Sequence, residues 1–307
     1  MPLKKIIFIV GPTSVGKTAL SAVLARKLKA EVISCDSMQV YKEISVVNNK
    51  PPKKLLKEVP HHLVGILSIR KDFDVAAFRK KTREVIRRIQ EKSKIPLIVG
   101  GSGLYVKILL DGIFEKNAKN EGLRRTLEAE AKEKGSQVLH EQLKKVDPKA
   151  ASKIHPHDTK RIIRALEVFL LTKKPISKLQ KTRQGLWGNY DIRVFFLDRE
   201  RDELYRRIDG RVEEMFEQGL VEEIKGLSDE KWSKTAGAMI GLKEVRGFLS
   251  GEYGLERAKE LMKQNTRRYA KRQLTWFRRD ERFKRIPVGE KETPKDIAEK
   301  ILKHIRK

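Results

Sequence analysis

Residues 11–18 read G-P-T-S-V-G-K-T and match the phosphate-binding loop pattern G-x-x-x-x-G-K-[ST] at each fixed position. In such a loop, successive backbone N–H groups and the N-terminal end of the next helix surround a phosphate group. Lys17 would add a positive charge, and the Thr18 hydroxyl could hold a Mg²⁺ ion that bridges phosphate oxygens. The residues that we predict to bind a phosphate or diphosphate are Gly11, Pro12, Thr13, Ser14, Val15, Gly16, Lys17 and Thr18. The loop alone does not distinguish phosphoryl transfer from release of a diphosphate.

The residues on either side of this loop fit the strand and the helix that the motif requires. Residues 6–10 are all apolar, as expected for a strand buried on both faces of a sheet. After the loop, Leu20, Leu24 and Leu28 recur at helical spacing. An ordinary glycine turn before a helix is disfavoured because strand, loop and helix occur in the required order.

Two further predicted strands end in residues that could contact a ligand. Residues 31–34 are followed by Asp36, and residues 95–99 run into the glycine turn 100–103. Because the carboxyl ends of parallel strands line the ligand crevice, both ends are expected near the phosphate loop. A carboxylate at Asp36 can serve as a general base or a Mg²⁺ ligand, and capping of the next turn is the simpler alternative.

The character of the chain changes near residue 114. Residues 121–146 are charged and helical in pattern, and Asp158 is a predicted N-cap for a further amphipathic helix. We therefore predict an α/β protein with a P-loop-type parallel sheet core. Residues 1–113 would form the first part of this catalytic core, 114–187 a helical insertion domain, and 188–307 the rest of the core with C-terminal basic helices.

Basic residues on two later helices are candidates for binding phosphates. Arg207 and Arg211 are one turn apart after a predicted strand at 192–197, a spacing suited to clamping a diphosphate. Either could instead be a surface residue. Residues 266–279 interleave basic side chains with aromatic ones, which suits phosphate contacts and base stacking. Core packing is the favoured role for Trp276 and Phe277 in that stretch.

The composition points to a polyanionic partner. The formal net charge is +28, from 69 Lys and Arg against 41 Asp and Glu. Such an excess is typical of nucleic-acid binding, although a lysine-rich surface from biased composition or life at high temperature would look similar. The single cysteine, Cys35, excludes a disulfide framework and a Cys-rich zinc site. We find no hydrophobic segment typical of a signal peptide or membrane span, and expect a cytoplasmic protein without a membrane partner.

Seven stretches in a fixed order are more specific than any one of them. They are the phosphate loop, D-S-M-Q-V-Y at 36–41, F-D-V-A-A-F-R at 73–79, I-V-G-G-S-G-L-Y at 98–105, H-P-H-D-T-K-R-I-I-R-A-L-E-V at 155–168, I-G-L-K-E at 240–244 and T-R-R-Y-A-K-R-Q-L-T-W-F-R at 266–278. Together they resemble the bacterial tRNA dimethylallyltransferases (tRNA isopentenyltransferases). The resemblance runs from residue 6 to about residue 280.

This resemblance implies a prenyltransferase that acts in tRNA modification. The dimethylallyl group of dimethylallyl diphosphate would pass to the N6 amine of the adenosine just 3′ of the tRNA anticodon, position 37, giving N6-isopentenyladenosine and pyrophosphate. By similarity, Asp36 is the general base, Thr18 lies near the bridging oxygen and the Mg²⁺ cofactor, and Arg211 binds the diphosphate. The partners would be the anticodon stem-loop and the prenyl donor, and we expect a monomer.

The resemblance also implies that the insertion domain at 114–187 is tRNA-contacting, and it implies a set of tRNA contacts. They are Asp36, Ser37, Met38, Gln39, Ser102, Arg124, Lys160, Arg161, Ile162, Ile163, Arg164, Ala238, Met239, Ile240, Gly241, Leu242 and Lys243. The chain departs from the family's usual pattern at two nearby places. Ser102 stands where threonine is usual, which keeps the hydroxyl. Residues 43–51 read E-I-S-V-V-N-N-K-P where the family usually has G-M-D-I-G-T-A-K-P, so the family pattern does not predict the geometry of this loop.

Two other functions remain open at the level of sequence. A P-loop kinase or NTPase acting on a nucleoside or RNA would use the same phosphate loop. Hydrolysis of ATP, or phosphate transfer from it, would identify that class. A non-catalytic RNA-binding protein on an altered enzyme scaffold is the second alternative, suggested by the unusual residues at 43–49. Measurable prenyl transfer would exclude it.

Overall fold

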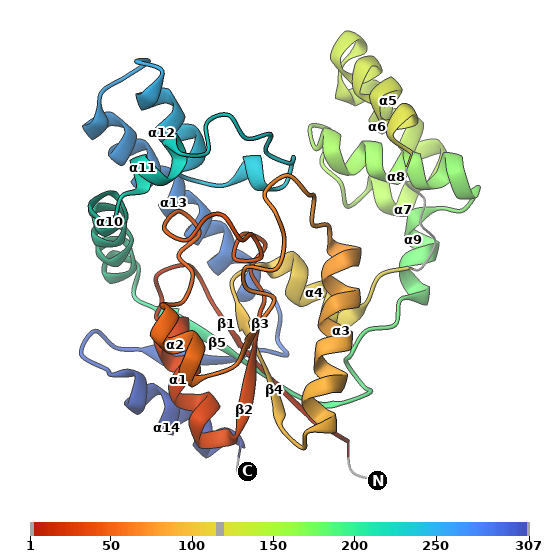
Figure 1. Cartoon of the computed structure of the whole chain (residues 1–307). Helices are drawn as coiled ribbons and strands as arrows, with labels where there is room; N and C mark the ends of the chain where they lie inside the picture. The colour runs from red at the N-terminus through yellow and green to blue at the C-terminus, as the bar shows by residue number, and fades with distance from the viewer. Residues whose placement is uncertain (1–2, 115–119, 306–307) are drawn as a thin grey trace. The chain divides into compact units, whose positions relative to one another are not determined.

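The chain folds into two compact units (Figure 1). The computed structural model describes residues 3–114 and 120–305. A core unit consists of residues 1–109 and 187–307, and an inserted unit consists of residues 110–186.

The core unit is built on six parallel strands, which confirms the predicted P-loop-type sheet. The strands are β1 (Lys5–Val10), β2 (Ala30–Ser34), β3 (His61–His62), β4 (Ile95–Gly100), β5 (Asp191–Arg199) and β6 (Lys284–Val288). Their order across the sheet is β3-β2-β4-β1-β5-β6. The central strand β1 pairs with β4 on one side and β5 on the other, so the phosphate loop leaves from the middle of the sheet.

Apolar strands and amphipathic helices explain why this sheet is buried on both faces. Residues 6–10 of β1 have no exposed surface, as their all-apolar composition predicts. Figure 1 shows α1 (Lys17–Leu28) and α14 (Pro294–Ile305) on one side of the sheet and α3 (Val75–Glu91) on the other. α1 buries Leu20 and Leu24, and α14 packs against it. The result is a three-layer α/β core whose strand ends carry the candidate site.

The remaining helices of the core unit come from both of its chain segments. They are α2 (Lys53–Glu58), α4 (Gly103–Asp111, which continues into the inserted unit), α10 (Arg201–Glu217), α11 (Leu220–Lys225), α12 (Leu242–Leu249) and α13 (Leu255–Phe277), with a short 3-10 helix at Ala236–Ala238. α10 packs against α13, and α12 packs against α13 as well. Phe277 is buried and Trp276 is half-buried against Phe277 and Phe283, which agrees with the packing role favoured for both residues.

The inserted unit is helical and has a hydrophobic core of its own. Its helices are α5 (Glu121–Lys134), α6 (Ser136–Val146), α7 (Pro148–Ala151), α8 (Thr159–Thr172) and α9 (Ile176–Leu179), followed by a 3-10 turn at Gln180–Thr182. Leu139, Leu143 and Leu166 lie in this core. Gly135, with φ of 85°, separates α5 from α6. Asp158 caps α8 by accepting a hydrogen bond from the backbone N–H of Arg161, as predicted.

None of the helices within the described ranges is long and apolar enough to cross a membrane.

Candidate active site

The phosphate loop has the backbone geometry that anion binding requires. Gly16 has φ of 103°, in the left-handed region that favours glycine, and it is the N-cap of α1. No side chain caps this helix, so its first N–H groups face the loop without a side-chain acceptor. At Gly11, a Cβ atom would lie 2.9 Å from the backbone oxygen of Leu197. Glycine is therefore needed at Gly11 for close packing and at Gly16 for the turn.

Lys17 is half-buried beneath this loop. Its Nζ donates hydrogen bonds to the backbone oxygens of Gly11 (2.9 Å) and Pro12 (2.6 Å). Burial lowers the pKa of Lys17 to about 8, and the nearby carboxylate of Asp36 opposes part of that shift. A bound anion would favour the protonated form, so the charge of Lys17 is coupled to ligand binding.

Two arginines of α10 reach the loop from its rim. The Nη1 atom of Arg211 donates to the Thr13 hydroxyl at 2.8 Å, and Nε of Arg207 donates to the backbone oxygen of Ser14 at 3.0 Å. Nε of Arg211 is buried without a hydrogen-bond partner among the described residues, as is the Ser14 hydroxyl. Burial lowers the pKa of Arg211, and Asp36 counters this shift. Unpaired buried donors are costly, and an anionic ligand would satisfy both groups.

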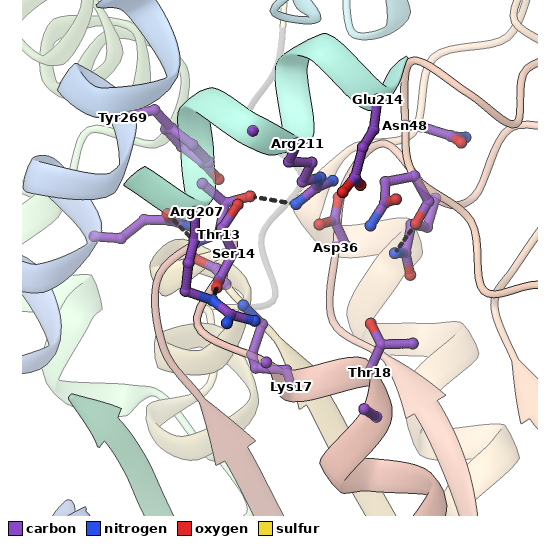
Figure 2. A pocket seen from close by; sticks show the side chains of 17 residues that line it. Thr13, Ser14, Lys17, Thr18, Asp36, Asn48, Arg207, Arg211, Glu214 and Tyr269 are labelled. Atoms are coloured by element: carbon purple, nitrogen blue, oxygen red, sulfur yellow. Dashed lines mark hydrogen bonds between the residues drawn. The ribbon is translucent and has the colours of Figure 1, made fainter. Parts of the chain in front are cut away.

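The predicted catalytic residues line one pocket of about 500 Å³ (Figure 2). Thr18, Asp36 and Arg211 all contribute to its wall, together with Lys17 and Arg207. Figure 2 shows Asp36 beside Arg211, with Thr18 on the far side of the pocket. The pocket is bounded by cationic groups and hydroxyls on the loop side, as a diphosphate site should be.

A second, mainly apolar pocket of about 310 Å³ adjoins the first. Thr13, Asp36 and Arg211 line both. The apolar part of its wall comes from Met38, Val47, Ile208, Val212, Met215, Met239, Ile240 and Met262. Asp36 therefore stands where a charged pocket meets an apolar one, which suits a reaction between a phosphorylated donor and a less polar group.

Two residues of α13 that the sequence motifs did not assign to the site help to build it. Gln273 accepts a hydrogen bond from the backbone N–H of Thr13 (3.0 Å) and donates one to the backbone oxygen of Gly101 (2.8 Å). It thereby joins the phosphate loop to the second glycine turn. Tyr269 lines both pockets and hydrogen-bonds Ser102, and burial raises its pKa to about 12. Their spacing of four residues on one helix is the signal that could have identified them.

The predicted tRNA contacts of the core unit fall into two groups. Ser37, Met38, Ala238, Met239 and Ile240 line the second pocket. Gln39 lines the first pocket, and Ser102 is held by Tyr269. Lys243 is exposed, whereas Gly241, the N-cap of α12, and Leu242, its first residue, are buried. The segment 238–243 thus contributes both to the pocket wall and to the surface beside it.

The predicted tRNA contacts in the inserted unit are also divided between its surface and its interior. Lys160 and Arg161 are exposed on α8, whereas the side chains of Ile162 and Ile163 are buried in the core of this unit. Arg124 donates to both carboxylate oxygens of the buried Glu167 (2.8 and 2.9 Å), and Arg164 donates to it at 2.7 Å. Glu167 therefore fixes two of the predicted contact residues in place.

This fold and pocket define an α/β protein that has a loop of the phosphate-binding type, with a cationic pocket beside an apolar one. The model of the IPP transferase family matches residues 39–280, more than half of the chain. The tRNA dimethylallyltransferase of Alkaliphilus oremlandii is 43% identical over 306 residues, covering 99% of this chain and 97% of that protein. That of Carboxydothermus hydrogenoformans is 45% identical over 301 residues, covering 97% and 96%. The chain belongs to the IPP transferase (tRNA dimethylallyltransferase) family.

Solved structures agree with this assignment. The tRNA isopentenylpyrophosphate transferase of Bacillus halodurans has a TM-score of 0.72 and 39% identity, covering 99% of this chain and 97% of that one. A eukaryotic dimethylallyltransferase whose structures follow its action on tRNA has a TM-score of 0.79 and 31% identity, covering 94% of this chain and 74% of that one. The kinase alternative is not favoured by any of these similarities.

Proposed function

We propose that this protein transfers the dimethylallyl group of dimethylallyl diphosphate to the N6 amine of the adenosine just 3′ of a tRNA anticodon. The products are N6-isopentenyladenosine at position 37 and pyrophosphate. The observation that carries this proposal is the position of Asp36, which lines both the cationic pocket at the phosphate loop and the apolar pocket beside it. Family membership supports the same reaction.

In this reaction the N6 nitrogen of adenine attacks C1 of the prenyl donor while the C1–O bond to the diphosphate breaks. The amine is a weak nucleophile because its lone pair is delocalised into the ring. Asp36 accepts the N6 proton, a role typically worth about 10²–10⁴-fold in rate. Lys17 and Arg211 stabilise the negative charge that develops on the departing pyrophosphate.

The residues present fit a Mg²⁺ ion that is held mostly by the substrate. Mg²⁺ prefers oxygen ligands and is commonly bound by one or two protein groups plus phosphate oxygens. Thr18 and Asp36 offer a hydroxyl and a carboxylate in the pocket, and the Thr18 hydroxyl has no hydrogen-bond partner among the described residues. No cluster of three metal-binding side chains is found within the described ranges. When bound, the ion would neutralise charge on the diphosphate.

The positive charge of the chain supports an RNA substrate. Phosphate contacts from Lys160 and Arg161 of α8 and from Arg268 and Arg272 of α13, all exposed, would position the anticodon stem-loop. The target base must leave its stack to reach Asp36, at a cost of a few kcal/mol. We propose that the protein works in the cytoplasm as a monomer.

Thermal stabilisation by bound ligand tests whether the donor is dimethylallyl diphosphate or a nucleotide. Dimethylallyl diphosphate with Mg²⁺ should raise the melting temperature more than ATP with Mg²⁺ does at equal concentration, because only the ligand that fits the folded state stabilises it. Pyrophosphate alone serves as the reference for the shared charged group. A larger shift with ATP, accompanied by phosphate release, would assign the protein to the kinase class instead.

The lowered pKa of Lys17 predicts a pH dependence. Because its charge is needed to bind the diphosphate and its pKa is about 8, kcat/KM for the donor should fall as pH rises past about 8. The limiting slope is about tenfold per pH unit. Rates measured from pH 6.5 to 10 test this. An active Lys17→Arg variant should keep its charge and move the fall to higher pH, whereas an unchanged profile in that variant would exclude Lys17 as the titrating group.

The exposed charges of α8 predict a salt-dependent tRNA affinity. Each neutralised phosphate contributes about 0.7–0.9 to the slope of log affinity against log salt. Reversing Lys160 and Arg161 to Glu should weaken tRNA binding and lower that slope by one to two such contributions, with donor affinity unchanged. Reversing Lys132 and Lys134, exposed on α5 of the same unit, is the control for net charge. An equal loss of tRNA affinity in the two double variants would show that only the overall charge of the protein matters for binding.

A further inference from the structure

The loop that departs from the family pattern is fastened to α11 by one carboxylate. The backbone N–H groups of Ser45 and Val46 donate to Oε1 of Glu223 at 2.6 and 2.9 Å, and that of Val47 donates to Oε2 at 3.0 Å. The Ser45 hydroxyl also donates to Oε1 at 3.0 Å. Hydrogen bonds to an ionised group are stronger than neutral ones. Three consecutive amides on one carboxylate therefore fix the backbone immediately before residues 48 and 49.

Asn49 follows this anchored stretch and lines the pocket at the phosphate loop, together with Thr18 and Asp36. Its φ of 47° is in the left-handed region, where asparagine is tolerated better than most side chains. Its backbone N–H donates to the oxygen of Val46, and its backbone oxygen accepts from Nε2 of Gln39. Within the described part of the chain, no group hydrogen-bonds its side-chain amide, which is half-buried. The backbone is thus fully engaged, and the side chain is left for a ligand.

We propose that Asn49 is a further diphosphate-binding residue of this site, donating from Nδ2 to a diphosphate oxygen, and that Glu223 is the residue that positions it. This inference rests on the proposed function, which makes the pocket a diphosphate site. The neighbouring groups decide which end of the amide is used. Lys17, Arg207 and Arg211 gather negative charge in this pocket, and a diphosphate oxygen accepts hydrogen bonds but cannot donate them.

The chemistry of the loop explains why a carboxylate at residue 223 matters. All the groups that face Glu223 are donors, so both of its oxygens act as acceptors. In Glu223→Gln one oxygen becomes an NH₂ group that faces a backbone N–H, so a bond is lost and two donors oppose each other. The side chain keeps its size. The loop should then hold residues 48 and 49 less firmly.

Direct titration with inorganic pyrophosphate tests the role of Asn49 without tRNA or turnover. Asn49→Gly removes the amide and tolerates the left-handed backbone, so it should fold normally. Its Kd for pyrophosphate should rise about tenfold or more, as expected for a lost hydrogen bond to a charged group. Asn49→Asp has the same shape but no donor, and with EDTA present it should bind pyrophosphate more weakly still. Asn49→Asp binding as tightly as wild type would overturn the donor role.

A double-mutant cycle tests the role of Glu223. Glu223→Gln should weaken pyrophosphate binding in the wild-type background, but should have little further effect once Asn49 is glycine, because its contribution passes through Asn49. Glu222→Gln, an exposed neighbour on the same helix, is the control and should bind like wild type. Equal effects of Glu223→Gln in both backgrounds would contradict the positioning role.

Titration of the wild-type protein separates the proposed function from the proposed role of Asn49. Failure of the wild type to bind pyrophosphate would contradict the proposed function and the role of Asn49 with it. Binding by the wild type and an equal Kd in Asn49→Gly would overturn the role of Asn49 alone. With dimethylallyl diphosphate as substrate, the same variant should raise the donor KM and leave the tRNA KM unchanged.

Discussion

Replacing Asp36 by asparagine is expected to lower the rate of prenyl transfer by about 100-fold or more, with tRNA affinity within a few-fold of wild type. The substitution removes the proton acceptor and keeps the shape. Oδ1 of Asp36 accepts a hydrogen bond from the backbone N–H of Met38 at 2.8 Å, and the side-chain oxygen of asparagine can do the same. The local turn should therefore survive, so a loss of rate reports on chemistry. Single-turnover kinetics with saturating tRNA measures it.

Asp36→Ala is the useful comparison because it loses the turn contact as well as the base. If the two variants lose rate equally and bind tRNA alike, the turn contributes little. Near-normal turnover in Asp36→Asn would rule out Asp36 as the general base.

We also expect a large loss of catalytic efficiency when the guanidinium group of Arg211 is removed. Arg211→Ala should lower kcat/KM for the donor by roughly 10–150-fold, corresponding to about 1.5–3 kcal/mol for a lost bond to a charged group. Arg211 lines the pocket and donates to the Thr13 hydroxyl, and its buried Nε has no hydrogen-bond partner among the described residues. Its loss removes positive charge where the leaving group gains negative charge. Steady-state kinetics with varied donor tests this.

Arg207→Ala is the matched control, since this arginine is one turn away on α10 and bonds only the backbone oxygen of Ser14 in the loop. We expect a smaller effect there because the residue is more exposed. A larger loss in Arg207→Ala than in Arg211→Ala would mean that Arg207 is the main clamp.

The strands that contain a continuous apolar run could be predicted from the sequence. The four predicted strands at 6–10, 31–34, 95–99 and 192–197 are confirmed as β1, β2, β4 and β5. Two strands at the sheet edges, β3 and β6, were missed. β3 has only two residues, and β6 contains Pro287, so neither has a distinct apolar run. Their pairing depends on neighbours distant in the chain.

The residues of the candidate site that lie in or beside a local motif could be predicted, whereas those placed by long-range contacts could not. Lys17, Thr18 and Asp36 were predicted because each lies in or beside a motif at a strand end, and they share one pocket. Gln273 was not assigned because its contacts lie 172 and 260 residues away, and no local spacing encodes them. Likewise, the sequence of the loop at 43–49 contains no sign that Glu223 anchors it. Long-range hydrogen bonds of this kind are decided by tertiary structure.

Identification of the nucleoside that the reaction produces is the decisive test of the proposed prenyl transfer. Purified protein, dimethylallyl diphosphate, Mg²⁺ and unmodified tRNA are incubated, and the digested nucleosides are analysed by mass spectrometry. We predict N6-isopentenyladenosine at position 37, released pyrophosphate in equal amount, and no product with Asp36→Asn in the same time. Absence of prenylated adenosine with active-site residues intact, or phosphate transfer from added ATP, would contradict it.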